Sequence, residues 1–350
     1  MSHKMLAVMK THPRRGAELV EAPVPSPAAD EVLVKVEATS ICGTDFHIYE
    51  WNKWAESRIR IPQIMGHELA GEVVEIGSDV KALKEGDYVS AETHIPCGHC
   101  YSCLTGSMHV CLNMKILGVD RDGAFAEYIT VPEVVAWKND RSITPPFAAI
   151  QEPLGNAIDT VLAEDIAGKT VLITGLGPIG LMAIELCRAC GATTIIGSDP
   201  IKYRRDLGAT LGATALLDPT STDLVSEVRN LTDGTGVEVL LEMSGNPRAL
   251  DQGMKSLVPG GRISLLGLFN GDITLDINNG MIFKSARIYG ITGRKMFSTW
   301  FKSRQFLSSK VVDLSSIITH TFKLSEFEKG MEHMAAGTCA KVVLIPDNVA

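Results

Sequence analysis

The sequence lacks the features that would place the protein at a membrane or on nucleic acid. Its 350 residues carry 33 Lys and Arg against 41 Asp and Glu, a formal net charge of −8, without a run of basic residues. Nucleic acids and anionic lipid surfaces attract concentrated positive charge, so neither is expected as a partner. No uninterrupted apolar stretch approaches the roughly 18 residues of a membrane-spanning helix, and the first five residues lack the apolar core of a secretory signal. We expect a soluble cytoplasmic protein that binds a small molecule.

The pattern of strands and helices divides the chain into two parts. A length of 350 residues exceeds one ordinary core, so two domains are expected. Short β-like runs, such as residues 31–36 and 70–77, fill the first part and predict a compact β barrel. Strand-like runs then alternate with helical ones, which predicts an α/β domain with a doubly wound parallel sheet. The predicted strands of that sheet are residues 170–174, 193–198, 215–217, 237–243, 262–266 and 287–292.

The alternation of strand-like and helical runs ends after residue 293. The chain ends in an apparent strand over residues 341–346, which suggests that the tail returns to the first domain. We therefore predict a β-rich domain of residues 1–156, completed by residues 293–350, and a nucleotide-binding domain of residues 157–292.

A glycine-rich turn lies between the first strand and the first helix of the α/β part. Gly175 permits the tight turn, Gly177 lets the backbone approach a pyrophosphate, and Gly180 lets helix and strand pack closely. Pro178 suits a first helical turn, whose free N–H groups bind phosphate. The next strand ends at Asp199, an acid placed to accept hydrogen bonds from the ribose hydroxyls of NAD. This combination favours a dinucleotide site over a glycine turn that binds nothing.

The choice between NAD and NADP depends on the residues that follow this strand. Asp199 would repel a 2′-phosphate, whereas the basic residues Lys202, Arg204 and Arg205 could hold one. We favour NAD because the acid is present, and NADP is the alternative.

Four cysteines lie within fifteen residues and have the spacing of metal ligands. Cys97, Cys100, Cys103 and Cys111 can surround one zinc ion with four thiolates, and a site without an open position is structural. An iron–sulfur cluster is the alternative, because its motif also opens with C-x2-C-x2-C. The fourth cysteine of that motif comes after three residues and precedes proline, whereas Cys111 comes after seven and precedes Leu112. The spacing favours zinc. A further pair, Cys187 and Cys190, lies in an apolar helix pattern and is expected to be inert.

A second set of ligand types has the composition of a catalytic zinc site. Cys42, His67 and Glu68 are the Cys, His and carboxylate of an open site, where a metal lowers the pKa of a bound hydroxyl. Thr44 and His47 follow Cys42 closely, and a hydroxyl followed by an imidazole makes a plausible proton relay.

Glu152 lies at the junction between the two predicted domains. One interpretation makes it a carboxylate that acts at the catalytic site. The other makes it an exposed linker acid or a charge at a helix N-terminus.

These motifs together resemble the zinc-dependent medium-chain dehydrogenases of the alcohol dehydrogenase superfamily. The run Gly66-His67-Glu68-x2-Gly71-x5-Gly77 fits the zinc signature of that family, and the resemblance covers essentially the whole chain. It implies a GroES-like β-barrel catalytic domain, a Rossmann domain and two zinc ions per chain. Cys42 and His67 would be zinc ligands, and Glu68 would bind zinc or exchange with water. Thr44 and His47 would form the proton relay, and the four-cysteine loop would hold the structural zinc.

Residues 46–55 and 291–300 are most similar to the branch of this family that oxidises the 3-hydroxyl of L-threonine to 2-amino-3-oxobutanoate. The resemblance implies a homotetramer and a role for Glu152 in proton transfer. We predict Arg294 as partner of the substrate carboxylate, Glu152 or a neighbour as partner of its ammonium, and His94 as a weaker contact. The cofactor contacts implied by the resemblance are Ile179, Asp199, Arg204, Leu266, Gly267, Leu268, Ile291 and Thr292.

Two alternatives have different consequences. A polyol or secondary-alcohol dehydrogenase of the same family would share every metal and cofactor residue and differ only in the substrate lining. A non-enzymatic nucleotide-binding protein with this fold should have lost its zinc ligands, whereas this chain has kept all seven.

Overall fold

The computed structural model describes residues 3–349, which form two compact units. The first unit runs to Glu152 and also contains Met296–Trp300 and the residues from Ile318 onward. The second unit contains Pro153–Lys295 and Phe301–Ile317. Within residues 3–349, the longest and most apolar helices still fall short of what a membrane crossing needs.

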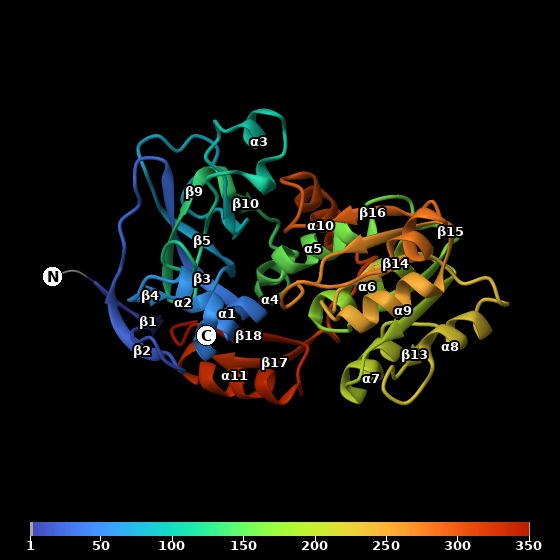
Figure 1. Cartoon of the computed structure of the whole chain (residues 1–350). Coiled ribbons are helices and arrows are strands. Elements are labelled where there is room, and N and C mark those ends of the chain that lie inside the picture. Colours follow the sequence, from blue (N-terminus) through green and yellow to red (C-terminus); the bar gives the residue numbers. More distant parts are fainter. Residues whose placement is uncertain (1–2, 350) are drawn as a thin grey trace. The chain divides into compact units, whose positions relative to one another are not determined.

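Antiparallel strands dominate the first unit (Figure 1). Its main sheet has the order β10-β6-β5-β3-β18-β17, with β9 also paired to β3, and a smaller sheet has the order β2-β1-β4. The strands are β1 (Lys4–Lys10), β2 (Glu18–Pro23), β3 (Glu31–Ile41), β4 (Gln63–Ile64), β5 (Glu68–Ile76), β6 (Tyr88–Ala91), β7 (His94–Ile95), β8 (Lys115–Ile116), β9 (Tyr128–Pro132), β10 (Ala136–Lys138), β17 (Ile318–Lys323) and β18 (Lys341–Ile345). The helices are α1 (Gly43–Glu50), α2 (Lys53–Arg58), α3 (Tyr101–Leu104), α4 (Pro145–Ala149) and α11 (Phe327–Ala336). This is the β-rich, barrel-like part that the sequence predicts.

The pairing of β3 with β5 brings distant ligand residues together. The two strands are antiparallel, with Ser40 opposite Glu68. Strand β3 ends at Ile41, just before Cys42, and β5 begins at Glu68, just after His67. Cys42 and His67 therefore lie at the same end of this strand pair. Only glycine fits at position 71, because a Cβ atom there would lie 2.1 Å from the carbonyl oxygen of Lys35 on β3. The pairing of these strands thus brings together Cys42 and His67, which are 25 residues apart in the sequence.

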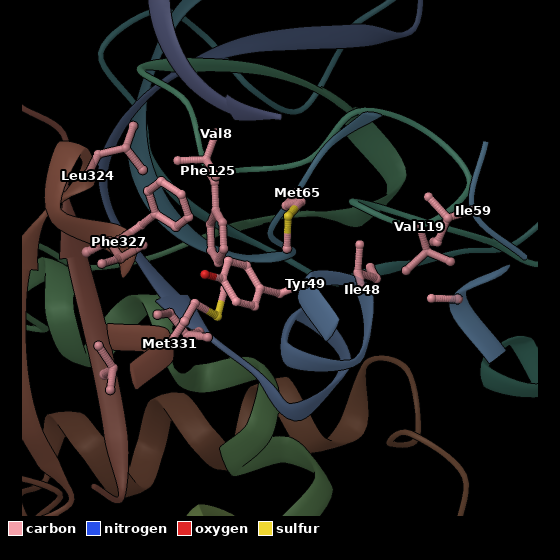
Figure 2. Close-up of a cluster of buried hydrophobic side chains, with 14 of the residues drawn as sticks. Val8, Ile48, Tyr49, Ile59, Met65, Val119, Phe125, Leu324, Phe327 and Met331 are labelled. Carbon is pink, nitrogen blue, oxygen red and sulfur yellow. The ribbon is translucent and has the colours of Figure 1, made fainter. Parts of the chain in front are cut away.

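A buried apolar cluster anchors helix α1, which follows Cys42 directly. Figure 2 shows Tyr49 of α1 beside Phe125, Phe327 and Met331, and all of these side chains are buried. The rings of Tyr49 and Phe327 meet edge to face, with centroids 6.5 Å apart. Strand β18 pairs antiparallel with β3 and parallel with β17. The C-terminal segment therefore completes the main sheet of the first unit and contributes to the buried cluster against which α1 packs.

The second unit contains a six-stranded parallel sheet in the order β13-β12-β11-β14-β15-β16. Its strands are β11 (Thr170–Thr174), β12 (Thr194–Ser198), β13 (Ala215–Leu217), β14 (Val237–Glu242), β15 (Leu257–Leu265) and β16 (Arg287–Gly290). Its helices are α6 (Pro178–Ala189), α7 (Lys202–Thr210), α8 (Leu224–Asn230) and α9 (Pro247–Ser256), while α5 (Gln151–Val161) and α10 (Ser298–Ser308) begin at the ends of first-unit segments. In order of sequence the sheet reads 3-2-1-4-5-6, so the predicted doubly wound Rossmann sheet is confirmed.

Candidate functional site

Cys42, His67 and Glu68 form a cluster of potential metal ligands in the first unit. One ligand atom from each residue lies within 4.8 Å of the others. His67 and Glu68 are buried, whereas Cys42 is partly exposed. A thiolate, an imidazole and a carboxylate at this spacing fit a zinc ion with room for an outside ligand. The predicted ligands are thus close together in space, and their role as ligands remains a prediction.

Asp45 supports this cluster and was not identified from the sequence. Its carboxylate accepts hydrogen bonds from the backbone N–H groups of Cys42, at 2.9 Å, and Gly66, at 3.2 Å. Its Oδ1 atom also lies 3.4 Å from Nδ1 of His67. Burial by itself would lower the pKa of His67, but the adjacent Asp45 and Cys42 outweigh it and raise that pKa well above its usual value. The Asp45 carboxylate therefore holds the backbone at Cys42 and Gly66 and also contacts the imidazole ring of His67.

Lys341 is a second residue that the sequence did not reveal. Its ammonium lies 2.6 Å from the carboxylate oxygens of Glu68 and donates a hydrogen bond of 3.1 Å to the carbonyl oxygen of Ile41. The hydroxyl of Ser40 donates to Oε2 of Glu68. Burial raises the pKa of Glu68 although Lys341 opposes this shift. A lysine in an apolar terminal strand gives no local sign of such a partner 273 residues away.

Thr44 and His47 lie three residues apart on helix α1, so they share a face of that helix. Thr44 is partly buried near Cys42, whereas His47 is exposed. The Nδ1 atom of His47 lies 3.1 Å from Nδ2 of Asn52. This placement suits a relay from a buried hydroxyl to water, although the relay itself remains a prediction.

Glu152 is buried, with 5% of its surface exposed. The hydroxyl of Thr93 donates to its Oε1 atom at 3.4 Å. Its charge contributes to the raised pKa of both Glu68 and Lys341. The alternative that Glu152 is an exposed linker acid is therefore wrong. The other alternative, a charge at a helix N-terminus, agrees with its place in the first turn of α5, and its proposed role at the catalytic site stays open.

The neighbouring His94 is held by a buried acid. Its Nδ1 atom lies 3.1 Å from Oε1 of Glu92, and its backbone N–H donates to the same oxygen. The other oxygen of Glu92 accepts a 2.7 Å hydrogen bond from the indole of Trp300. His94 therefore has a fixed orientation, which suits the predicted contact with a substrate.

The four cysteines of the predicted structural zinc site converge. Their Sγ atoms all lie within 4.8 Å of one another, with Cys100 at 3.5 Å from Cys103 and 3.7 Å from Cys111. Backbone N–H groups point at the sulfurs, among them Leu112 N–H at 3.4 Å from Cys100. A hydrogen bond from the backbone of His99, followed by one from Asn113, lowers the pKa of Cys97 to about 5. The residues fit a closed four-thiolate zinc site.

Cys187 and Cys190 behave as the sequence predicts for inert thiols. Cys187 is fully buried, and burial raises the pKa of both thiols. Neither is a reactive thiolate at neutral pH.

The dinucleotide turn has the expected geometry in the second unit. Gly175 has a φ of +89°, which few other residues adopt, and helix α6 begins at Pro178 after Gly177. A Cβ atom on Gly180 would lie 2.0 Å from the carbonyl oxygen of Gly175, so the helix and the turn require glycine at both positions. A cavity of about 380 Å³ opens at this turn. Its lining includes Gly175, Gly177, Ser198, Asp199, Arg204, Ser244, Asn246 and Arg248.

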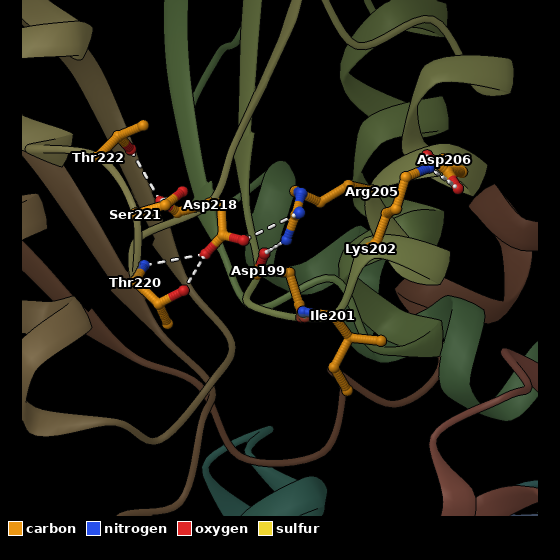
Figure 3. A network of polar contacts seen from close by, with 9 residues as sticks. All are labelled: Asp199, Ile201, Lys202, Arg205, Asp206, Asp218, Thr220, Ser221 and Thr222. Atoms are coloured by element: carbon orange, nitrogen blue, oxygen red, sulfur yellow. Dashed lines mark hydrogen bonds and ion pairs between the residues drawn. The ribbon is translucent and has the colours of Figure 1, made fainter.

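Asp199 lies at the end of β12 and is held rigidly beside this cavity. Its carboxylate accepts 2.8 Å hydrogen bonds from the N–H groups of Leu176 and Ile201. Figure 3 shows two of the three basic side chains that follow it, Lys202 and Arg205, and each of them forms an ion pair with another acid. Lys202 pairs with Asp206 at 2.7 Å, and Arg205 pairs with Asp218 at 3.0 Å.

The remaining member of the basic cluster is Arg204. It lines the cavity with its Nη1 atom 3.7 Å from Asp199. The geometry therefore favours ribose hydroxyls over a 2′-phosphate beside Asp199. Arg248 also lines the cavity and was missed, because it follows a strand that carries no sequence motif.

The other predicted cofactor residues lie on the loops after β15 and β16. The N–H groups of Leu266 and Gly267 both donate to the carbonyl oxygen of Glu242, and Leu268 is 93% exposed. Ile291 follows β16, and its N–H donates to Leu265. These loops follow the carboxyl ends of parallel strands, where ligands of such sheets bind. Ile179 lies in the first turn of α6, and Thr292 directly follows Ile291.

Arg294, the predicted partner of the substrate carboxylate, is fully buried. Its Nη1 atom donates a 3.0 Å hydrogen bond to Asn156. A Cβ atom on Gly155 would lie 2.5 Å from Cδ of Arg294, so the helix leaves room for this side chain. The guanidinium is thus held in one orientation, and its role remains a prediction.

Comparisons with known proteins agree with this geometry. Residues 28–141 match the family model "Alcohol dehydrogenase GroES-like domain", and residues 178–309 match "Zinc-binding dehydrogenase". The chain is 56% identical to L-threonine 3-dehydrogenase of Pyrococcus horikoshii over 346 residues, which cover 99% of each chain. It is 49% identical to the enzyme of that name from Bacillus subtilis over 345 residues, again 99% of each.

Among solved structures, a zinc-binding dehydrogenase from Sinorhizobium meliloti 1021 with bound NADP is 31% identical. The two superpose with a TM-score of 0.91 over 98% of this chain and 100% of the other. The chain therefore belongs to the zinc-binding medium-chain dehydrogenases of the alcohol dehydrogenase superfamily.

Proposed function

We propose that this protein oxidises the 3-hydroxyl of L-threonine to 2-amino-3-oxobutanoate with NAD as hydride acceptor. The observation that carries the proposal is the full-length similarity to L-threonine 3-dehydrogenases from an archaeon and a bacterium. Full retention of Cys42, His67, Glu68 and the four-cysteine loop supports an enzyme rather than a nucleotide-binding protein without activity.

The two ligand clusters have different tasks. Cys97, Cys100, Cys103 and Cys111 would hold a structural zinc ion and stabilise their loop. Cys42 and His67, with Glu68 beside them, would hold a catalytic zinc ion, which lowers the pKa of a hydroxyl bound to it. The proposed division is a catalytic domain of residues 1–156, completed by 293–350, and an NAD-binding domain of residues 157–292.

The residues around the catalytic cluster move the proton and orient the substrate. The hydroxyl of Thr44 would take the proton of the substrate hydroxyl and pass it to His47, whose exposed ring releases it to water. Glu152 would support this transfer or meet the ammonium group. We assign the substrate carboxylate to Arg294 and a weaker contact to His94, because buried and oriented charges reduce the cost of desolvating a zwitterion.

The second unit would bind the dinucleotide. Asp199 would accept hydrogen bonds from the adenosine ribose, and the first turn of α6 would bind the pyrophosphate. Bound there, NAD would supply the acceptor for the hydride that leaves C3 of the substrate. A homotetramer in the cytoplasm completes the proposal. The tetramer rests on the family likeness alone.

The test is a comparison of substrates with purified enzyme. We would measure kcat/KM for L-threonine, sorbitol and 2-butanol with NAD at one pH. L-Threonine should give the highest value, because only it presents a carboxylate and an ammonium for charged partners. If sorbitol or 2-butanol exceeds L-threonine, the protein is a polyol or secondary-alcohol dehydrogenase of the same family.

A further inference from the structure

The loop after β13 forms one wall of the cavity at the glycine-rich turn. Pro219 and Thr220 of this loop line the cavity, and Asp199 lines it from the end of the neighbouring strand β12. Strands β12 and β13 pair in parallel, with Ser198 opposite Leu217, so the two loops leave the sheet side by side. The spacing of these loops therefore determines how wide the cavity is beside Asp199.

Arg205 of α7 bridges the two loops. Its Nη1 atom donates a 2.6 Å hydrogen bond to the carbonyl oxygen of Asp199, and its Nη2 atom lies 3.0 Å from Oδ2 of Asp218 (Figure 3). The side chain of Arg205 is 17% exposed and that of Asp218 is 24% exposed. The ion pair of Lys202 with Asp206 on the same helix is far more exposed, and such surface pairs contribute little. One guanidinium thus links the backbone of the first loop to the carboxylate of the second.

The carboxylate of Asp218 also fixes the conformation of its own loop. Its Oδ1 atom accepts hydrogen bonds from the N–H and the hydroxyl of Thr220, at 2.9 and 2.6 Å. The hydroxyl of Thr222 donates to the carbonyl oxygen of Asp218 at 2.8 Å. The hydrogen bonds from Thr220, and then the charge of Arg205, lower the pKa of Asp218, so its carboxyl is ionised at neutral pH. Asp218 therefore holds the cavity residue Thr220 with one oxygen and Arg205 with the other.

Helix α7 carries both Arg205 and a residue of the cavity. Arg204 lines the cavity, and its buried Nε atom makes no hydrogen bond within residues 3–349. Successive residues of an α-helix point in directions roughly 100° apart, so Arg204 faces the cavity while Arg205 faces the loop after β13. Arg205 therefore fastens the first turn of α7, and Arg204 with it, to the opposite wall.

We propose that Arg205 and Asp218 are positioning residues that hold the two loops at the spacing required by the adenosine half of the cofactor. The described residues that line the cavity include neither of them, so they act through Asp199, Arg204 and Thr220, which do line it. Walls that are already ordered lose less freedom when a ligand binds, so the pair raises the affinity for the cofactor. This inference rests on the proposed function, since it requires that the cavity binds the adenosine half of NAD.

The test is calorimetric titration of the purified, zinc-loaded enzyme with NAD and with ADP-ribose, which has the adenosine half but no nicotinamide. In Arg205→Met both dissociation constants should rise about fivefold, the scale of the ordering cost that a loosened wall adds to binding. The KM for NAD should rise as well. The kcat at saturating NAD and substrate should not fall, because the lost interaction is the same in the ground state and the transition state. A residue that only stabilised the fold would leave both dissociation constants unchanged.

Three further variants test whether the two residues act as a pair. Asp218→Asn keeps an acceptor for Thr220 but loses the charge that holds Arg205, so it should weaken NAD binding by a similar factor. The double variant Arg205→Met with Asp218→Asn should bind NAD no more weakly than either single variant, because the effects of two residues in one ion pair do not add. Arg205→Lys keeps the charge and should restore part of the affinity.

Arg287→Met is the matched control. Arg287 of β16 likewise pairs with an acid, Glu164 at 2.7 Å, and donates to a carbonyl oxygen, that of Gly260 at 2.7 Å. It lies in the same unit but outside the lining of the cavity. This variant should lower the melting temperature without changing the affinity for NAD.

The outcomes are distinct. Wild-type affinity for NAD in Arg205→Met would overturn the inference, and so would losses that add in the double variant. A loss of the same size in Arg287→Met would also overturn it, because any destabilisation of the second unit would then weaken NAD binding. A wild-type enzyme that binds neither NAD nor ADP-ribose would overturn the proposed function instead.

Discussion

The Oδ1 atom of Asp45 lies 3.4 Å from Nδ1 of His67, and both side chains are buried. The Nδ1 atom makes no hydrogen bond within the described part of the chain, so its contact with the Asp45 carboxylate orients the ring on this side. The same carboxylate accepts hydrogen bonds from the N–H groups of Cys42, itself a predicted ligand, and of Gly66, which directly precedes His67. Asp45 therefore organises Cys42 and His67 without being a ligand itself.

Replacing Asp45→Asn should weaken zinc binding at the open site by about 10–100-fold, the usual effect of losing a carboxylate behind a histidine ligand. The amide keeps the size of the side chain but loses the charge that orients His67. Zinc affinity can be measured by competition with a chromophoric chelator. The four-cysteine site is the internal control, because its affinity should not change. Equal affinity of the open site in both proteins would show that Asp45 has no such role.

Two zinc ions per chain should leave at different rates. The four-cysteine set surrounds its ion, whereas the set of Cys42, His67 and Glu68 leaves access from outside. Chelation should therefore remove one ion and the activity first, while circular dichroism still reports a folded protein. Elemental analysis gives the count before and after. One zinc per chain, or iron with sulfide, would contradict this expectation.

Local patterns in the sequence identified most of the fold and both ligand clusters. Strands 170–174 and 215–217 have the predicted bounds, because apolar runs between turn residues mark buried parallel strands well. Strand β15 begins at Leu257 rather than at 262, and the early part of this strand contains Pro259, Gly260 and Gly261, residues that are uncommon inside strands. Residue type and spacing grouped the four cysteines, and Cys42 with His67 and Glu68, and the structure brings each group together in space.

The residues that support the site could not be found in this way. Lys341 meets Glu68 only because β18 pairs with β3, a contact between strands separated by some 300 residues. Nothing near Lys341 in the sequence distinguishes it from an exposed lysine on an edge strand. Asp45 lies in the first turn of α1, where an acidic residue is common, so its residue type and position do not by themselves reveal its contact with His67. Both roles depend on tertiary contacts, which local periodicity does not encode.

Replacing Asp199→Ala should weaken NAD binding by about 1–3 kcal/mol, the scale of a lost charge-assisted hydrogen bond together with an unpaired ribose hydroxyl. Part of the lost NAD affinity will come from a loosened glycine-rich turn, because the Asp199 carboxylate also accepts hydrogen bonds from the N–H groups of Leu176 and Ile201. Isothermal titration with NAD and NADP measures both affinities. The wild type should prefer NAD strongly, and the variant should discriminate less. Equal use of both cofactors by the wild type would mean that Arg204 and Arg248 determine the preference.

Glu164 should stabilise the second unit in a pH-dependent manner. Hydrogen bonds from Arg287 and then Tyr289 lower the pKa of its carboxyl to about 2. A lowered pKa in the folded state means that the stabilisation is complete above the unfolded-state pKa, roughly 4.3, and is lost as pH falls toward 2. Because the pair is partly exposed, we expect only about 1 kcal/mol. Glu164→Gln should therefore melt lower than wild type at pH 7, and the difference should shrink at pH 3. A difference that is constant with pH would contradict the charge argument.

The relay through Thr44 and His47 predicts different losses for different substitutions. Thr44→Ala removes the hydroxyl and should reduce kcat by about 10²–10⁴-fold, the usual contribution of a group that transfers a proton. Thr44→Ser keeps the hydroxyl and should retain much of the activity, while zinc content stays unchanged in both variants. His47→Gln should have a milder effect, because His47 is exposed and water can replace its ring. Its activity should be restored in part by added imidazole. If Thr44→Ala with full zinc turns over as fast as the wild type, the proton leaves by another route.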